Sequence, residues 1–110
     1  MIEKTIIDYL NDNLVVPAYM EMPEDKPERF VLLEKTGSSV ENLIYSATFA
    51  IQSYAESLYE AAVLNEEVKK AMDNIIALDS VLSSKLNSDY NFTDTETKEY
   101  RYQAVYDLFY

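Results

Sequence analysis

The sequence predicts an α+β fold: a mainly antiparallel sheet with two helices on one face, in the order α-β-β-β-α-β-β. Two segments place apolar residues at helical spacing, and five others alternate or run apolar as strands do. Short polar stretches join neighbouring strands, and such hairpin connections imply a mainly antiparallel sheet with helices laid on one face. The chain has 110 residues, which suits a single domain over residues 1–110.

The first predicted helix begins at the N-terminus. Ile2, Ile6, Leu10 and Leu14 follow one another at intervals of four residues, so they form one apolar stripe on a short helix. Pro17 cannot continue a helix, and we expect the helix to end before it.

Two strands and two loops are predicted next. Residues 16–22 alternate as a short strand, and PEDKPER (residues 23–29) forms a polar loop. FVLLEKT (residues 30–36) is apolar and β-branched at its start, which indicates a strand. TGSSVEN (residues 36–42) contains the only glycine, Gly37, and is predicted to be a hairpin-like loop.

The clearest alternation in the chain lies in ENLIYSATFAIQSYA, residues 41–55. A long strand with one apolar face belongs to an antiparallel sheet that is packed on one side. The residues expected on the packed face are Leu43, Tyr45, Ala47, Phe49 and Ile51.

The second predicted helix begins near Ser57. Ser57 and Glu60 have the spacing of a capping box, in which the serine oxygen accepts from the third backbone N–H and the glutamate reaches back. The stretch SYAE, four residues earlier, has the same form, so the helix start is open by one turn. The buried stripe is expected to contain Leu58, Ala61, Leu64, Val68, Ala71, Met72 and Ile75.

Two strands close the chain, joined by the polar turn TDTETKE. In residues 80–92, the side chains of Leu82, Leu86, Tyr90 and Phe92 are expected on one side. The last strand spans residues 100–110. Its predicted faces are Tyr100, Tyr102, Ala104, Tyr106, Leu108 and Tyr110 on one side, and Arg101, Gln103, Val105, Asp107 and Phe109 on the other.

The chain is strongly acidic, with 9 Lys and Arg against 20 Asp and Glu and a formal net charge of −11. This charge disfavours nucleic acid as a direct, sequence-specific partner and disfavours an anionic membrane surface. Acidity keeps a protein soluble. A sharper alternative is an acidic face that repels copies of the chain until the right partner arrives.

Cysteine and histidine are absent, which removes thiol nucleophiles, imidazole bases, disulfides and the commonest zinc ligands. The lack of cysteine fits the cytoplasm. The charged N-terminal segment does not match a secretory leader, and no apolar run approaches the roughly 20 residues that span a bilayer. We therefore expect a soluble protein with no membrane partner.

No pattern in the sequence indicates catalysis. Carboxylate pairs such as Glu66 and Glu67 come without a neighbouring base, an apolar pocket or a metal-ligand signature. The single glycine excludes phosphate-binding loops, dinucleotide turns and nucleophile elbows. We expect a protein that is not an enzyme, with no catalytic, metal-binding or cofactor-binding residues and no cofactor.

The tyrosines are the remaining unusual feature, with ten tyrosines and no tryptophan. Tyrosine forms strands well and covers half-buried sheets, but it is also enriched at protein interfaces. Contacts are expected from the loop at residues 36–42, the loop at residues 23–29 and the last strand. The candidate interface residues are Gly37, Ser38, Ser39, Tyr102, Val105, Tyr106, Phe109 and Tyr110.

Three stretches together resemble a known family: FVLLEKTGSS, ATFAIQSYAESLYEAAVLNEEVKKAM and SKLNSDYNFTDTETKEYRYQAVYDLFY. In this order and spacing they are similar to the tail terminator (tail completion, head–tail joining) proteins of long-tailed phages and Gram-positive prophages, the family of lambda minor tail protein U. The resemblance covers about Phe30 to Tyr110, while the N-terminal third matches in length and element order. The family pattern leads us to expect a second glycine after Gly37. This chain has Ser38 at that position, so the tip of this loop departs from the family.

The resemblance implies a structural virion protein. Members assemble as a homo-oligomeric ring on the finished tail tube, stop its polymerisation and present a surface to head-completion proteins. The implied partners are other copies of the chain, the tail tube protein and a head-completion protein. The implied location is the head–tail junction of the virion, and the host cytoplasm during assembly.

Two alternatives stay open. The chain could be a head-closure or connector protein from the same kind of gene cluster, which would bind portal-side complexes in place of tail tubes. It could instead be a small acidic protein-binding domain that works as a monomer, which light scattering across a range of concentrations would reveal.

Overall fold

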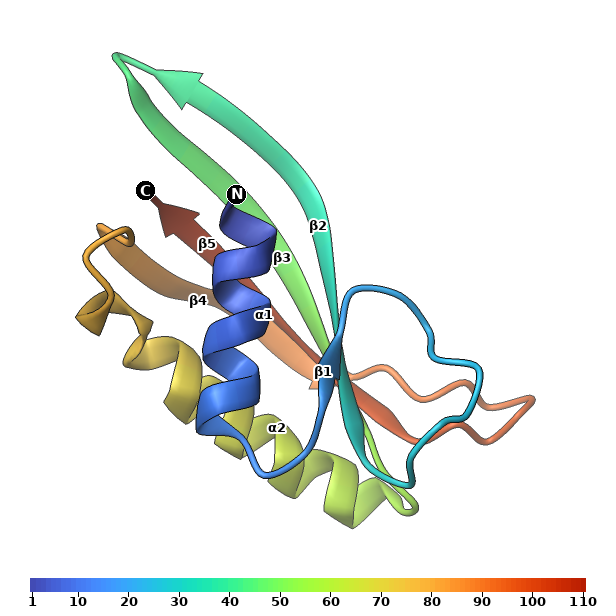
Figure 1. Ribbon diagram of the computed structural model, residues 1–110. Helices are drawn as coiled ribbons and strands as arrows, with labels where there is room; N and C mark the ends of the chain where they lie inside the picture. Colours follow the sequence, from blue (N-terminus) through green and yellow to red (C-terminus); the bar gives the residue numbers. More distant parts are fainter.

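The computed structural model describes residues 1–110 and contains two α-helices and five strands (Figure 1). A short 3-10 turn follows the second helix. The elements are α1 (Ile2–Asn13), β1 (Ala18–Tyr19), β2 (Phe30–Glu41), β3 (Ile44–Tyr54), α2 (Leu58–Asp73), η1 (Ile75–Ala77), β4 (Ser83–Asn91) and β5 (Arg101–Phe109). The predicted order α-β-β-β-α-β-β is therefore confirmed.

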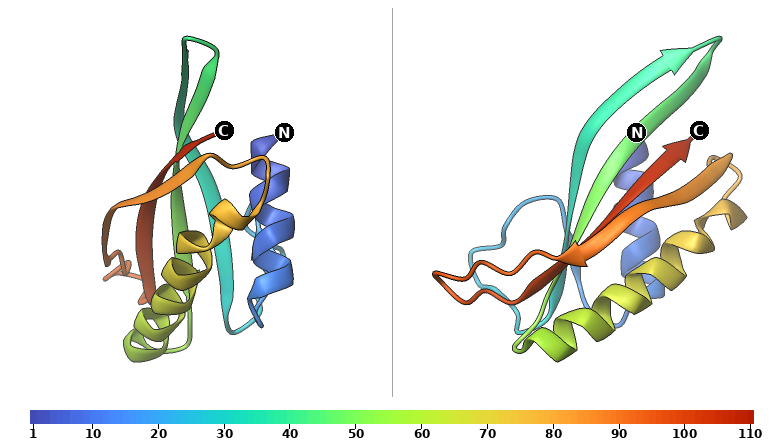
Figure 2. Two further views of the ribbon diagram at one scale, coloured as in Figure 1. Left: turned by 90° about the vertical axis from the view of Figure 1, so that its left-hand side faces the viewer. Right: turned by 180° about the vertical axis from the view of Figure 1, so that it is seen from behind.

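The strands form one sheet in the order β1-β2-β3-β5-β4. The short β1 pairs with β2 in parallel, and every other neighbouring pair is antiparallel. Both helices lie on the same face of the sheet, as the views in Figures 1 and 2 agree. The predicted α+β class, with a mainly antiparallel sheet and two helices on one face, is confirmed. The opposite side is called the open face below.

The first helix uses the predicted stripe, since Ile2, Ile6 and Leu10 are all buried. Asn11 has a role that its weak helix propensity does not suggest. Its side-chain oxygen accepts the backbone N–H of Ala18 at 3.0 Å, and its amide donates to the Ala18 carbonyl at 3.2 Å. The side chain of Asn11 thereby pairs with β1 as a neighbouring strand would.

The second helix starts where the capping pattern predicts. Ser57 adopts an extended conformation, and its hydroxyl accepts the backbone N–H of Glu60 at 3.1 Å. This bond satisfies one of the free donors of the first turn. The predicted return contact from the Glu60 side chain is absent, because that carboxylate faces Arg29 at 3.4 Å. Leu58, expected in the buried stripe, is exposed.

The core lies between the helices and the alternating residues of β2, β3 and β5. Phe49 and Ile51 of β3 and Leu108 of β5 are fully buried, as predicted for one face of each strand. Their helical partners occupy positions three and four residues apart, which is the spacing of one helix face. The helical residues of this cluster are Ile2, Ile6, Leu10, Leu64, Val68, Ala71 and Met72.

Two bulges change the predicted faces. The register of β2 shifts between Lys35 and Gly37, and the register of β4 shifts between Leu86 and Ser88. An extra residue reverses the side-chain alternation beyond it. In β4 the extra residue separates Leu86 from Tyr90, which lie on opposite faces instead of the single face expected from the sequence.

Candidate functional site

Several exposed apolar residues gather at the tip of the β2–β3 hairpin, which extends beyond the helices and the other strands (Figures 1 and 2). Glu41 pairs with Ile44, so Asn42 and Leu43 form a two-residue turn. Both have positive φ, 51° and 65° respectively. A turn of this kind requires positive φ at both central positions, and asparagine followed by glycine is preferred there.

Leu43 is therefore an outlier in both conformation and environment. A left-handed conformation brings the Cβ of an L-residue too close to the following carbonyl, which costs roughly 1–2 kcal/mol. The Leu43 side chain is 90% exposed, so no packing within the chain offsets this cost. Val40, Ile44 and Tyr45 beside it are also exposed. We call these four residues, Val40, Leu43, Ile44 and Tyr45, the hairpin tip.

The C-terminal residue fixes the base of the hairpin tip. The Tyr110 N–H donates to the Tyr45 carbonyl at 2.9 Å, and the Tyr45 N–H donates back at 3.3 Å. Their rings stack with centroids 5.9 Å apart. The last rung of the β3–β5 ladder thus holds Tyr45 in place and leaves Val40, Leu43 and Ile44 beyond it.

The predicted loop at residues 36–42 is wrong, because the turn lies at Asn42 and Leu43. Gly37, Ser38 and Ser39 belong to β2, where all three are exposed. Gly37 has no positive φ, and a side chain there would meet no atom within 4 Å. The glycine is therefore not required by the backbone conformation or by packing.

The candidate residues of the last strand divide between the two faces of the sheet. Tyr102 and Tyr110 point toward the helices and are half-buried, whereas Val105 and Phe109 lie on the open face. Val105 is half-buried there, and Phe109 is 46% exposed. Phe109 shares a cross-strand row with Ser39 through Ser46, so these two predicted residues do come together on the open face.

Tyr106 is a core residue, which corrects the prediction that it lies on an interface. It is completely buried, and its hydroxyl lies 3.0 Å from a carboxylate oxygen of Asp73 and 3.2 Å from the Lys69 carbonyl. Burial, followed by the bond to Asp73, raises the pKa of this hydroxyl well above its usual range. The alternation of β5 placed Tyr106 on a face that α2 covers completely.

A row of hydrogen-bonded side chains lies on the open face, and the sequence did not predict it. Gln52 and Gln103 lie opposite each other in register, and the Gln52 amide donates to the Gln103 oxygen at 2.9 Å. Tyr54 donates to the Gln52 oxygen at 3.0 Å, and the Gln103 amide donates to the Tyr90 hydroxyl at 2.6 Å. Arg101 completes the row with a bond to the Tyr54 hydroxyl at 3.0 Å. We call these five residues the amide row.

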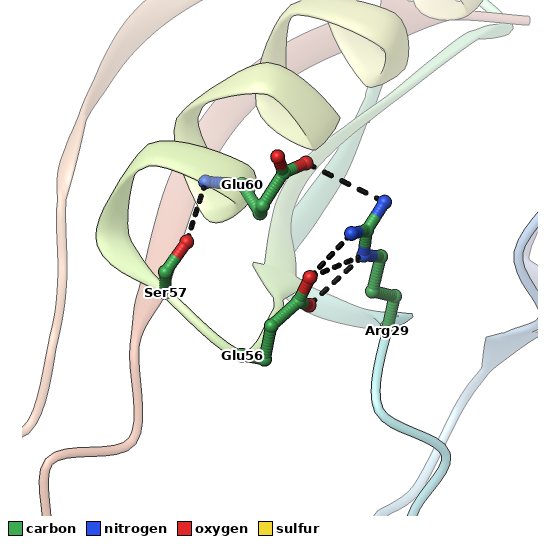
Figure 3. A network of polar contacts seen from close by, with 4 residues as sticks. All are labelled: Arg29, Glu56, Ser57 and Glu60. Atoms are coloured by element: carbon green, nitrogen blue, oxygen red, sulfur yellow. Dashed lines mark hydrogen bonds and ion pairs between the residues drawn. The ribbon is translucent and has the colours of Figure 1, made fainter.

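Charged residues near the loops fix the structure locally. Figure 3 shows Arg29, at the end of the loop before β2, between Glu56 and Glu60 at the start of α2. The Arg29 Nε atom lies 2.9 and 3.0 Å from the two carboxylate oxygens of Glu56. Hydrogen bonding to Arg29 lowers the pKa of Glu56. This contact ties the 23–29 loop, a predicted contact element, to the helix.

A second charged cluster lies between α2 and β4. The Lys69 ammonium is 2.9 Å from both Asp89 and Glu66, and Asn65 donates to Asp89 at 2.9 Å. The hydrogen bonds that Lys69 donates to Asp89 and then to Glu66 raise the pKa of Lys69. No group of three or more acidic residues in the chain could hold a metal ion. Neither α1 nor α2 has the length and apolar character of a membrane-spanning helix.

Together these features define an α+β domain whose most prominent surface is an exposed apolar hairpin tip beside the end of an aromatic strand. No protein-family model matches the chain, and no curated protein matches it. The resemblance to tail terminator proteins therefore stays a prediction from the sequence.

Proposed function

We propose that this protein is a structural, non-enzymatic subunit that assembles as a ring on the end of a phage tail tube. There it ends tube polymerisation and presents the surface that a head-completion protein binds. The observation that carries the proposal is the hairpin tip. It places Leu43 in a costly conformation and exposes it almost fully, which favours a residue kept for contact with another protein.

The energetics of the hairpin tip support this role. Leu43 gains little by folding, because 90% of its surface stays in water. Burial of a leucine side chain against a partner contributes about 1.5–3 kcal/mol, which is similar to or larger than the cost of its conformation. A protruding tip with four apolar residues can therefore contribute to a docking contact that the free chain does not itself satisfy.

The sequence supports the same proposal independently. The stretches that resemble tail terminators include Phe30 to Ser39 and Ala47 to Met72, so they contain most of both strands of this hairpin. The acidic net charge of −11 suits a subunit whose free copies repel one another and dock on complementary surfaces. A location at the head–tail junction follows from the proposed role.

Tube assembly with and without the protein tests the proposal. The test uses the tail tube protein that the proposal implies as a partner; it is polymerised, and tube lengths are measured by negative-stain electron microscopy. We expect added protein to sediment with tubes, stop their growth and appear as a ring at one end. Leu43→Asp is expected to weaken tube binding at least tenfold, because a charge replaces a buried apolar contact.

Val15→Asp is the matched control for this experiment. Val15 is 95% exposed and lies in the connection between α1 and β1, at the opposite end of the molecule from the hairpin tip (Figure 1). This variant is expected to cap tubes normally. Tubes that grow to unregulated lengths in the presence of the wild-type protein would contradict the proposal.

A second candidate is a monomeric acidic protein-binding domain. The amide row favours it, because this part of the open face satisfies its polar groups within one chain. Gln52, Tyr54 and Gln103 are buried there without a covering layer. Light scattering separates the two candidates: a constant monomer mass at every concentration, with tubes present or absent, favours the binding domain.

A further inference from the structure

The sheet has two unpaired edges. At one edge, β1 covers only Val31 and Leu32 of β2, so the nine residues from Leu33 to Glu41 pair with β3 alone. At the other edge, the nine residues of β4 pair with β5 alone. Unpaired N–H and C=O groups along a strand are a template for pairing with another chain.

The two edges are complementary in direction. Three successive antiparallel pairings, β2–β3, β3–β5 and β5–β4, separate them. The strands β2 and β4 of one chain therefore run in opposite directions. When β4 of one copy is laid beside β2 of the next, with the open faces continuous, the new pair is antiparallel, which is the more stable arrangement.

The edges are also complementary in charge. The registers place Glu34 and Glu41 of β2 on the open face, together with Lys85 of β4. All three are exposed, and none forms an ion pair within the chain. Opposite charges on neighbouring strands stabilise a pairing, whereas like charges destabilise it. Pairing of β2 with β2 would bring acids together, and pairing of β4 with β4 would bring lysines together.

We propose that copies of this chain join head to tail through β4 of one copy and the free part of β2 of the next, so that one sheet continues across subunits. The occupant of each edge is a second copy of this chain. Such a heterologous contact closes into a ring when the rotation between copies permits. The inference rests on the proposed ring-forming function and identifies the surface that would build the ring.

Two charge-reversed variants test the pairing. Lys85→Glu makes both edges acidic, and the double variant Glu34→Lys/Glu41→Lys makes both edges basic. Each variant alone is expected to self-associate at least tenfold more weakly than wild type, because each places like charges across the contact. An equimolar mixture restores opposite charges at every contact, so it is expected to form mixed assemblies. Circular dichroism verifies that each variant is folded.

Sedimentation velocity measures the assemblies with the wild-type protein, each variant and the mixture, in the presence and absence of tail tubes. Lys70→Glu, an exposed change on α2 rather than on either edge strand, is the control for a general loss of positive charge. Restored assembly in the mixture, with neither variant assembling alone, supports the inference. Equal assembly of all the variants, or a mixture that stays monomeric while wild type associates, overturns it.

The two proposals can fail separately. If wild-type protein caps tubes but the charge-reversed variants cap them equally well, the edge pairing is overturned and the capping function stands. If wild-type protein does not bind tubes, the capping function is overturned, and the solution experiment alone decides the pairing. A wild-type protein that stays monomeric under all these conditions overturns the pairing.

Discussion

Replacement of Leu43 by glycine should make the protein more stable and less able to bind its partner. Leu43 occupies the second position of the β2–β3 turn with a φ of 65°. Glycine adopts this conformation without steric cost. The leucine side chain is 90% exposed, so its removal loses almost no packing within the chain.

The expected gain follows from two opposing effects. Relief of the left-handed conformation contributes roughly 1–2 kcal/mol. Glycine also increases the conformational freedom of the unfolded chain, which offsets about 0.4–1 kcal/mol of that gain. The difference between the middle values of these two ranges is about 0.8 kcal/mol in the free energy of unfolding, which corresponds to a rise of roughly 3–6 °C in Tm for a domain of this size.

Thermal unfolding followed by circular dichroism, together with urea titration, measures this gain. Val15→Gly is the matched control, because Val15 is equally exposed but has no positive φ; this variant is expected to lose stability. The tube-capping assay is run in parallel, where Leu43→Gly is expected to bind more weakly. A Leu43→Gly variant that melts at or below the wild-type temperature would refute the strain argument.

Three further outcomes are expected. Ser57→Ala removes the acceptor for the Glu60 N–H and should lower the free energy of unfolding by about 1 kcal/mol in urea titration, whereas a loss within experimental error would contradict the cap. Tyr106 has a folded-state pKa raised above the ordinary 10.0, so its contribution to stability is present below pH 10 and is lost as the pH rises further. Tyr106→Phe should therefore show a weaker fall of Tm above about pH 10 than wild type, and equal slopes would contradict this. Tyr110→Ala removes the stacking on Tyr45 and should speed amide hydrogen exchange at Tyr45 but not at the buried Phe49; unchanged exchange at Tyr45 would show that the ring contributes nothing.

The helices were predictable because local patterns determine them. The four-residue spacing of Ile2, Ile6 and Leu10 identifies the buried face of α1 whatever it packs against. Ser57 identifies the start of α2, because its hydroxyl caps a backbone group three residues away. Neither feature depends on which strands are neighbours.

The candidate site was less predictable because it depends on register. The only glycine suggested a turn at Gly37, whereas the turn lies at Asn42 and Leu43, without the glycine that usually marks it. The bulge in β2 lies beside Gly37, which is a common bulge signal but was interpreted as a turn, whereas the bulge in β4 has no glycine to mark it. The pairing of Gln52 with Gln103 is visible only once β3 and β5 are aligned, so the amide row could not be found from spacing alone.

The amide row has a consequence for where neighbours can attach. Each of its two glutamines both donates and accepts within the sheet, and both are buried, so little of their polar surface is accessible to a visiting protein. The amide row is therefore a poor binding surface for another protein. The hairpin tip and the two sheet edges remain available for contact. This restricts the orientations in which two copies of the chain can bind each other.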